Sequence, residues 1–228
     1  NVRLIVPAAG MGLRLGLVRP KALVPVGGKP LLVRTLERLQ PLGLLAEPII
    51  TVPPRAESEF KALLCESFAE SAFSIITGGR ERQESVERAL NALDEADEIV
   101  VIHDAARPFV EPASVKASMD AAAECGAATV AIPCSDTIRV GDRDDLLVDT
   151  PERSRLWACQ TPQTFRVEAI RKAHQRARAE GFAGTDDATL VRRMGGAVKL
   201  VKGTPLNFKV TTPEDLALAE AIIEKGLV

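Results

Sequence analysis

The first group of residues that could do chemistry is a glycine-rich segment near the start of the chain, PAAGMGLRLG at residues 7–16, with Lys21 close behind it. Small residues let backbone N–H groups approach a phosphate chain, and Arg14 and Lys21 add fixed positive charge. The pattern predicts a triphosphate-binding loop, with an ordinary strand-to-helix turn as the alternative. The dinucleotide fingerprint GxGxxG fits less well, because Leu15 stands where its third glycine belongs.

A second candidate is the carboxylate of Asp104, which follows the apolar run at residues 99–102. Ligands of open α/β sheets bind where the strands end. Mg²⁺ needs few protein ligands there, because phosphate oxygens and water supply the rest. Asp104 is therefore the candidate Mg²⁺ ligand, and the alternatives are a cap on the next helix or an ion pair with Arg107. His103 should point away from it, because successive strand side chains face opposite sides.

Further groups of residues are only weak evidence for a binding site when each is taken singly. The segment GGRERQES at residues 78–85 has paired glycines that permit close approach of a flat ligand, and Ser85 could bind a base edge. Thr185, in the run TDDA, has the alternative of capping a helix. If residues 208–210 form a strand, Lys209 should point to solvent.

The apolar pattern of the chain supplies elements that could position these residues. Short apolar runs alternate with segments of helical period, which is typical of βα units around a largely parallel sheet. A last helix should begin at Thr212, with Pro213 at its first position and acidic residues in its first turn. The expected strands are residues 3–7, 48–52, 73–77, 99–103 and 128–133, and the expected helices are 31–39, 57–68, 85–95 and 114–124.

Residues 138–150, IRVGDRDDLLVDT, break this rhythm. Two short β-like pieces flank a charged, turn-rich centre, which predicts a hairpin that projects from the sheet. Such a hairpin has too little apolar content to fold alone. We therefore expect its apolar side chains to pack on another surface, plausibly a second subunit.

Charge and composition argue against several classes of protein. With 29 Lys and Arg against 31 Asp and Glu, the net charge is -2, which predicts no nucleic-acid partner. Apolar runs are too short to cross a bilayer, so we expect no membrane partner. Four scattered cysteines without a CxxC pair, and two distant histidines, argue against zinc. They predict buried free thiols and a cytoplasmic location.

Seven motifs taken in order resemble the 2-C-methyl-D-erythritol 4-phosphate cytidylyltransferase family, the CTP-using enzymes of the non-mevalonate isoprenoid pathway. The resemblance runs from Ile5 to about Ile222. It implies a Rossmann-like, mostly parallel α/β sheet with helices on both faces and a projecting β-hairpin arm. It also implies one nucleotidyltransferase domain over residues 1–228, with 136–156 as a dimerisation arm in a homodimer. The motifs are AAGxGxR with PK seven residues after the arginine, GGxxR, HDAARP, SDT, QTPQTF, TDDA and FKVTTPEDL.

The resemblance also implies a role for individual residues. Asp104 would bind Mg²⁺, and Lys209 would touch the reacting phosphates. The substrate arginine of the arm would be Arg153, with Arg155 as the alternative. CTP would be lined by Ala8, Ala9, Gly10 and Gly12, its triphosphate held by Arg14 and Lys21, and its cytosine and ribose surrounded by Gly79, Arg80, Ser85, Ala105 and Arg107. The sugar-alcohol phosphate would contact Thr185, together with Thr137 and Arg153 of the other subunit.

The reaction that the resemblance implies joins the CMP part of CTP to 2-C-methyl-D-erythritol 4-phosphate. A phosphate oxygen of that substrate would attack the α-phosphorus in line, and pyrophosphate would leave. No strong general base is needed, because a phosphate monoester is already a nucleophile near neutral pH. A ribitol 5-phosphate cytidylyltransferase is the alternative within the class. A nicotinamide-dependent dehydrogenase is a further alternative, and it rests on Gly10 and Gly12 alone.

Overall fold

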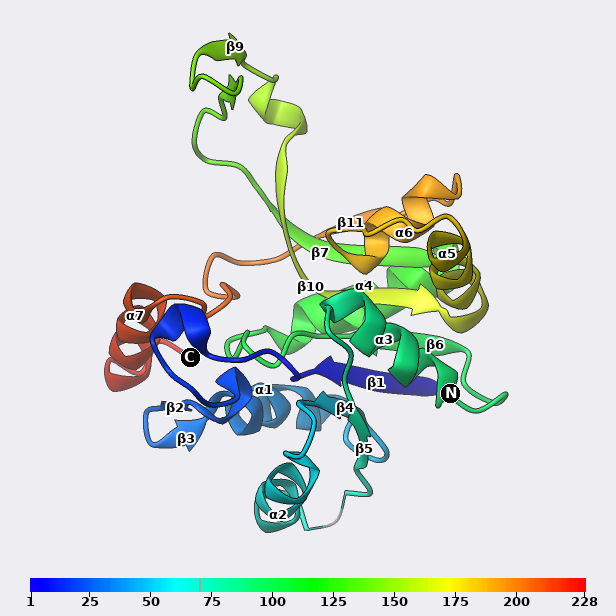
Figure 1. Ribbon diagram of the computed structural model, residues 1–228, viewed down its shortest axis with the longest axis vertical. Coiled ribbons are helices and arrows are strands. Elements are labelled where there is room, and N and C mark those ends of the chain that lie inside the picture. The colour runs from blue at the N-terminus through cyan, green and yellow to red at the C-terminus, as the bar shows by residue number, and fades with distance from the viewer. Residues whose placement is uncertain (70) are drawn as a thin grey trace.

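A seven-stranded sheet runs through the centre of the protein, whose computed structural model describes residues 1–69 and 71–228 (Figure 1). Its strands are β1 (Val2–Pro7), β4 (Ile49–Val52), β5 (Ser74–Thr77), β6 (Ile99–Ile102), β7 (Ala127–Pro133), β10 (Trp157–Arg166) and β11 (Lys199–Lys202). They lie in the order β11-β7-β10-β6-β1-β4-β5. Strand β10 is antiparallel to both of its neighbours, and the other pairs are parallel. The predicted Rossmann-like, mostly parallel sheet is confirmed.

Helices cover both faces of this sheet, as predicted. The six that do so are α1 (Leu31–Leu39), α2 (Glu57–Ser67), α3 (Arg82–Asn91), α4 (Pro112–Cys125), α5 (Val167–Ala179) and α6 (Asp187–Arg193). Side chains of a strand alternate between the two faces. Leu4 and Val6 of β1 therefore pack with α1, α2 and α4, whereas Ile5 packs with α3, α5 and α6. All three side chains are fully buried, so the apolar core is continuous on either side of the sheet.

The last helix, α7 (Pro213–Glu224), begins as the sequence predicts. The Thr212 hydroxyl accepts a hydrogen bond from the Asp215 N–H at 3.3 Å, and the Asp215 carboxylate accepts one from the Thr212 N–H at 2.9 Å. This reciprocal pair satisfies two N–H groups that the start of a helix leaves without partners. Val210, just before the cap, is buried against this helix, and so the segment that carries Lys209 is anchored.

The predicted hairpin is present and stands clear of the rest of the molecule (Figure 1). It consists of β8 (Val140–Gly141) paired antiparallel with β9 (Leu147–Asp149). Both strands belong to the segment 135–156, which leads out from β7 and returns to β10. Leu146, Leu147 and Val148 are 64%, 59% and 59% exposed. Apolar side chains exposed together on a projecting arm favour a contact with another surface. The single domain over residues 1–228 stays a prediction.

The four cysteines are free, but the expectation that they are buried is wrong. Cys65, Cys125 and Cys159 are exposed, and Cys134 is half-buried. Cys65 and Cys125 occupy helix positions that face solvent, so a thiol at those positions does not fill the core.

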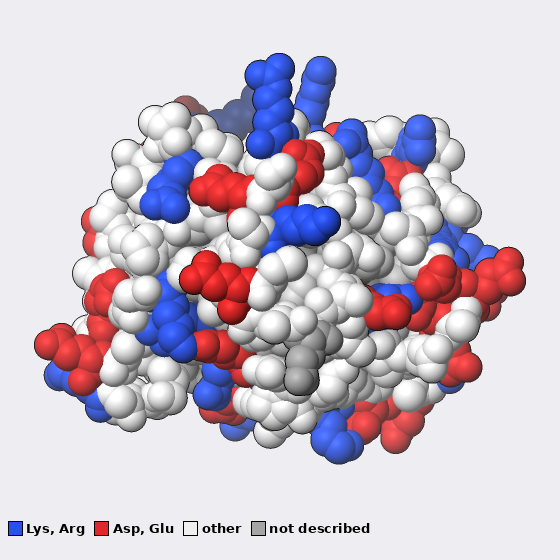
Figure 2. All heavy atoms as spheres, turned by 90° about the horizontal axis from the view of Figure 1, so that it is seen from below, with Lys and Arg blue, Asp and Glu red and all other residues white. Residues whose placement is uncertain are grey.

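Surface charge is mixed. Figure 2 shows Lys and Arg side chains interspersed with Asp and Glu over the face that lies below in Figure 1, in keeping with the net charge of -2. Within residues 1–69 and 71–228, no helix combines the length and the apolar character needed to span a bilayer.

Candidate active site

A pocket lies at the carboxyl edge of the sheet, where the segments after β1, β5 and β6 meet. This is the edge at which open α/β sheets bind their ligands. Most of the residues expected around a nucleotide line it. They are Ala8, Ala9, Gly10, Arg14, Lys21, Gly79, Arg80, Ser85, Asp104, Ala105 and Lys209.

The glycine-rich loop folds back on itself beside this pocket. The Gly12 N–H donates to the Arg19 carbonyl at 2.9 Å, and the Lys21 N–H donates to the Gly10 carbonyl at 3.0 Å. A Cβ at position 12 would lie 3.1 Å from the Arg19 carbonyl oxygen. Gly12 does not line the pocket, so its place in the structure differs from the expected one. It lets the loop close, and this closure brings Lys21 back to the pocket.

The segment after β5 forms the opposite wall. A Cβ at Gly78 would lie 2.4 Å from the Cβ of Ala9, so only glycine allows the two loops to approach this closely. The Ser85 hydroxyl accepts from the Gly79 N–H at 2.9 Å and donates to the Glu81 carbonyl at 3.1 Å. Ser85 thus lines the pocket as predicted, while its hydroxyl shapes the loop that presents Arg80.

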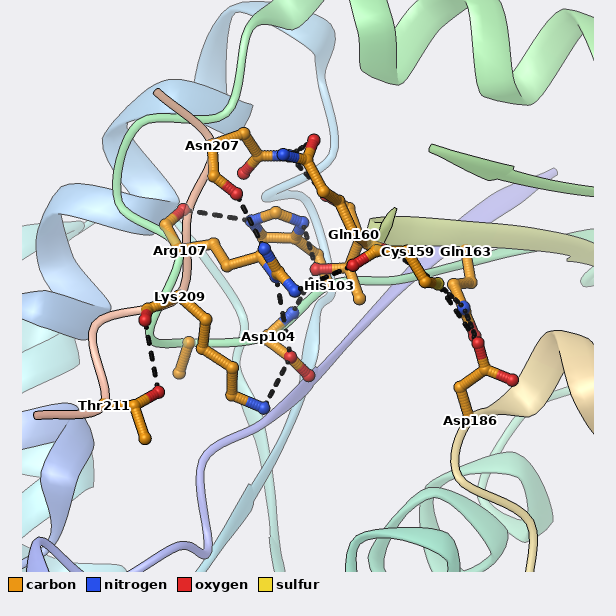
Figure 3. Close-up of polar contacts among 12 residues, drawn as sticks. His103, Asp104, Arg107, Cys159, Gln160, Gln163, Asp186, Asn207, Lys209 and Thr211 are labelled. Atoms are coloured by element: carbon orange, nitrogen blue, oxygen red, sulfur yellow. Dashed lines mark hydrogen bonds and ion pairs between the residues drawn. The ribbon is translucent and has the colours of Figure 1, made fainter. Parts of the chain in front are cut away.

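Asp104 is the buried carboxylate at the centre of the site (Figure 3). Its Oδ2 accepts from Lys209 Nζ at 2.8 Å, and its Oδ1 accepts from Arg82 Nε at 3.0 Å. The contact with Arg107 is longer, at 3.8 Å. Burial alone would raise the pKa of Asp104, but Arg82, Lys209 and Arg107 outweigh it and hold the pKa well below its usual range. The carboxylate is therefore ionised at neutral pH.

Lys209 does not point to solvent from a strand, and that expectation is wrong. The segment around it is irregular, and the side chain turns inward because Asp104 attracts it. The prediction for His103 is confirmed. Its ring is fully buried and bonds to the Arg107 carbonyl at 3.2 Å, on the side away from the pocket.

Arg82 is a site residue that the sequence reasoning missed. Its guanidinium joins Asp104 to the buried Asp187, with Nη1 donating to Asp187 at 2.6 Å. His174 Nε2 donates to the other oxygen of Asp187 at 3.0 Å. The motif GGxxR ends at Arg82, but the site role was assigned to Arg80, because the partner of Arg82 is Asp187 of α6, about a hundred residues away in the sequence.

Lys21 is a cation whose charge the site weakens. Burial lowers its pKa, the positive charges of Lys209 and Arg14 lower it further, and Asp104 opposes them only in part. The resulting pKa is about 8. A lysine with such a pKa is mostly charged at pH 7 and loses its charge within the next two pH units.

A second pocket adjoins the first. Arg82, Asp104 and Lys209 line both of them. Arg107 was expected near the cytosine and ribose, but it lines the second pocket, because its Nη1 donates to the Asn207 carbonyl at 2.7 Å and draws the side chain to that side. The remaining lining residues are Cys159, Gln160, Thr161, Gln163, Thr185 and Asp186.

Thr185 lies at the mouth of the second pocket, but its alternative role as a helix cap is wrong. Asp186 is the N-cap of α6, and its side chain accepts from the Thr189 N–H at 2.8 Å. Thr137 and Arg153 line neither pocket of this subunit. Arg153 lies at the base of the arm, exposed, and donates to the Ser135 carbonyl at 3.0 Å. Two adjoining cavities with a shared cationic wall suit a reaction between two anionic ligands.

Comparisons with known proteins agree with this geometry. The family model for 2-C-methyl-D-erythritol 4-phosphate cytidylyltransferase matches residues 2–225. A protein of that name from Caldanaerobacter subterraneus is 42% identical over 226 residues, which are 99% of this chain and 100% of the relative. The structure of 4-diphosphocytidyl-2C-methyl-D-erythritol synthase from Anaerococcus prevotii is 30% identical with a TM-score of 0.86, covering 98% of both chains. The cytidylyltransferase structure from Thermus thermophilus is 36% identical with a TM-score of 0.80, covering 97% of this chain and 98% of that one.

The lowered pKa of Lys21 predicts a pH dependence. As pH rises through about 8, Lys21 loses its proton. The value of kcat/KM for CTP should then fall, approaching about tenfold per pH unit well above the pKa, because kcat/KM reports groups of the free enzyme. Lys21→Arg keeps its charge at these pH values, so its profile should lack this alkaline limb. A limb that persists unchanged in Lys21→Arg would assign it to another group.

Two glycines should respond differently to a methyl group. No protein atom lies within 4 Å of a Cβ at Gly10, which lines the pocket. Gly10→Ala should therefore keep the melting temperature within about 2 °C and weaken CTP binding by about tenfold or more, because it occupies ligand space. Gly78→Ala, which meets Ala9, should lower both the melting temperature and the affinity. Calorimetric binding and thermal unfolding measure the two, and normal CTP affinity in Gly10→Ala would show that the nucleotide does not approach this backbone.

Proposed function

The chain belongs to the 2-C-methyl-D-erythritol 4-phosphate cytidylyltransferase family, and from this premise we propose how its two pockets serve the reaction. The enzyme is a nucleotidyltransferase of isoprenoid biosynthesis. It transfers CMP from CTP to methylerythritol phosphate, giving 4-diphosphocytidyl-2-C-methyl-D-erythritol and pyrophosphate. The observation that carries the proposal is the wall of Arg82, Asp104 and Lys209, which faces both pockets, so that two bound anions would meet there.

We propose that CTP occupies the first pocket. The small residues Ala8 to Gly10 allow its phosphates to lie against the backbone, and Arg14 and Lys21 reach the same side. The wall after β5 would receive the base and ribose, because the Gly79 backbone and the Arg80 side chain line the pocket there and can bind their polar groups. That wall comprises Gly79, Arg80 and Ser85, with Ala105 beside it.

The methylerythritol phosphate would occupy the second pocket. Arg107 and Lys209 supply positive charge for its phosphate, and Thr185 supplies a hydroxyl group. The Arg107 Nε is buried and has no hydrogen-bond partner among the described residues, which favours a ligand oxygen beside it. Arg107 is thus assigned to the second substrate, in place of the nucleotide.

Charge decides the chemical step. The substrate phosphate oxygen forms a bond to the α-phosphorus of CTP as the bond to the pyrophosphate oxygen breaks. Lys21, Arg14 and Lys209 would hold the two anions together and balance the charge that develops on the phosphates. The ionised Asp104 keeps Lys209 at the boundary of the pockets before ligands arrive.

The donor set of the site fits Mg²⁺. Among the described residues, no three His, Cys, Asp or Glu side chains gather to hold a metal by themselves. Mg²⁺ suits a single carboxylate, because phosphate oxygens and water complete its shell. We propose that Asp104 holds it with the CTP phosphates. When bound, the ion would neutralise phosphate charge.

The arm and the thiols support two further proposals. The exposed apolar side chains of the arm favour a homodimer, in which Thr137 and Arg153 would reach the second pocket of the partner. The proximity of Arg153 to the arm base favours it over Arg155 as the substrate arginine, because it already binds the Ser135 carbonyl beside Thr137.

The free cysteines suit a reducing compartment, so we propose a cytoplasmic enzyme.

A pyrophosphate-release assay tests the function. Purified protein with CTP and methylerythritol phosphate should release pyrophosphate, whereas ribitol 5-phosphate in its place should give far less. Equal or faster turnover with ribitol 5-phosphate would favour the alternative substrate. A protein that releases pyrophosphate with neither substrate would overturn the proposal.

The proposed metal site predicts a changed magnesium response. Asp104→Asn removes the carboxylate, so kcat should fall by about 10²-fold or more, and calorimetric CTP binding should no longer tighten when Mg²⁺ is added. Thermal unfolding checks that the variant is folded. Full activity across a magnesium titration would show that Asp104 is not a ligand.

The proposed dimer predicts complementation between two inactive variants. Lys21→Ala damages the nucleotide pocket and Arg153→Ala damages the arm that serves the partner. Refolding them together at equal amounts should restore about a quarter of wild-type activity, because about half the dimers are mixed and half of their sites are intact. Lys21→Ala with Arg14→Ala is the matched control and should restore none, because both changes fall in the nucleotide pocket. Monomers in solution, or no recovery after proven subunit exchange, would contradict the shared site.

A further inference from the structure

Gln160, Thr161 and Gln163 of the β10 motif QTPQ line the second pocket, but no role there has been assigned to them so far. The motif lies where the register between β10 and β7 shifts, between Cys159 and Gln163. Gln160, Thr161 and Gln163 are 4%, 5% and 0% exposed. Buried polar side chains need hydrogen-bond partners. These three find them in three different segments of the active site. Figure 3 labels Gln160 and Gln163 together with their partners Asn207 and Asp186.

Gln160 holds the segment that leads to Lys209. Its Nε2 donates to the Thr204 carbonyl at 2.8 Å, and its Oε1 accepts from Asn207 Nδ2 at 3.1 Å. The Asn207 carbonyl in turn accepts from Arg107 at 2.7 Å. Gln160 therefore fixes the backbone from which two of the cations of the second pocket, Arg107 and Lys209, are oriented.

Thr161 holds the segment that carries Asp104. Its hydroxyl accepts from the Asp104 N–H at 3.1 Å and bonds to His103 Nδ1 at 3.0 Å. The Arg107 carbonyl can only accept, so His103 must donate to it from Nε2, and Nδ1 is then an acceptor. The Thr161 hydroxyl thus donates to His103, and every group in this chain has a partner.

Gln163 holds the start of α6. Its Oε1 accepts from the N–H groups of Asp187 and Ala188, at 3.0 and 3.1 Å. Its Nε2 donates to the Asp186 carboxylate at 2.8 Å. Asp186 caps α6 and follows Thr185, so this amide sets the position of one wall of the second pocket.

We propose that Gln160, Thr161 and Gln163 are positioning residues that fix three walls of the second pocket relative to one another. These walls are the segment leading to Lys209, the segment that carries Asp104 and the start of α6. Gln163 fixes the last of them, which includes Thr185. The inference rests on the proposed function, because it assigns the second pocket to the sugar phosphate. Gln163 gives the sharpest test, because it does not line the nucleotide pocket.

Gln163→Glu replaces the amide nitrogen, which also lies 3.1 Å from the Thr129 hydroxyl and 3.1 Å from the Cys159 thiol, with an oxygen. The hydroxyl and the thiol can each donate to that oxygen, so the unfavourable contact is the one with Asp186. The remaining oxygen still accepts from the two N–H groups of α6, but a carboxylate replaces the amide donor that lies 2.8 Å from Asp186. The two anions repel and displace the Thr185 wall. The KM for methylerythritol phosphate should rise about tenfold or more, while the dissociation constant for CTP stays within about twofold.

Asp186→Asn in the same chain should reverse the effect. Asparagine caps a helix as well as aspartate does, and its amide can donate to the new carboxylate at position 163. The double variant should recover a KM within about threefold of wild type. Asp186→Asn alone places the amide nitrogen of Asn next to that of Gln163, so that two donors face each other, and it should also raise the KM. This variant therefore tests the same bond if Gln163→Glu fails to fold.

Thr164→Val is the matched control. Thr164 is the next residue of β10, is also fully buried, and bonds to Ser118 at 2.8 Å on the opposite face of the sheet. The variant should lower the melting temperature and leave the KM for the sugar phosphate unchanged. If Gln163→Glu behaves in the same way, its role is structural and the inference is overturned.

The remaining outcomes are also decisive. Raised KM values in both single variants without recovery in the double variant would show that the bond between positions 163 and 186 does not set the wall, which overturns the inference. Wild-type protein that releases no pyrophosphate would overturn the proposed function, and this inference with it. Active wild type with a normal KM in Gln163→Glu would overturn the inference alone.

Discussion

Two anions must be brought into contact in this site, and the cations needed for that repel one another. The protein places the buried carboxylate of Asp104 between two of them, and Arg82 and Lys209 bind its two oxygens. Removing a charge from water is costly unless it is paired. Asp104 lets Arg82 and Lys209 remain charged at the boundary of two pockets before any ligand arrives.

The cations come from segments that are far apart in the sequence, so their arrangement depends on the polar framework behind them. Gln163 on β10 holds the start of α6, and Asp187 at that start holds Arg82. A pocket wall held by hydrogen bonds can adopt fewer arrangements than an apolar wall, because any arrangement that leaves a buried donor or acceptor without a partner is costly. The antiparallel β10 therefore carries polar side chains into the sheet at the site, where the neighbouring β6 is wholly apolar and β7 contributes the buried Thr129.

Strands β1, β4, β5, β6 and β7 could be predicted because each is an apolar run of strand length, and the loops after β1 and β6 could be assigned to a site because they follow such runs. Strand β10 could not, since its Gln and Thr side chains are satisfied by hydrogen bonds and show no apolar alternation. The side to which Arg107 turns depends on Asn207, a hundred residues away. Arg82 could not be separated from Arg80 for the same reason: its partner Asp187 is distant in the sequence.

Arg82 is a cation paired with carboxylates, whereas Lys21 is a cation placed among other cations, and their pKa values shift in opposite directions. Burial opposes the charge of both, but Asp187 and Asp104 raise the pKa of Arg82 above its usual range, whereas Lys21 lies among Lys209 and Arg14 and its pKa falls to about 8. Arg82 is thus held in the framework by two carboxylates before any ligand binds, although its Nη2 has no hydrogen-bond partner among the described residues. Lys21 is left in a field that favours its neutral form, and a bound triphosphate would reverse that field. A bound triphosphate would complete the electrostatic balance of the loop that carries Lys21.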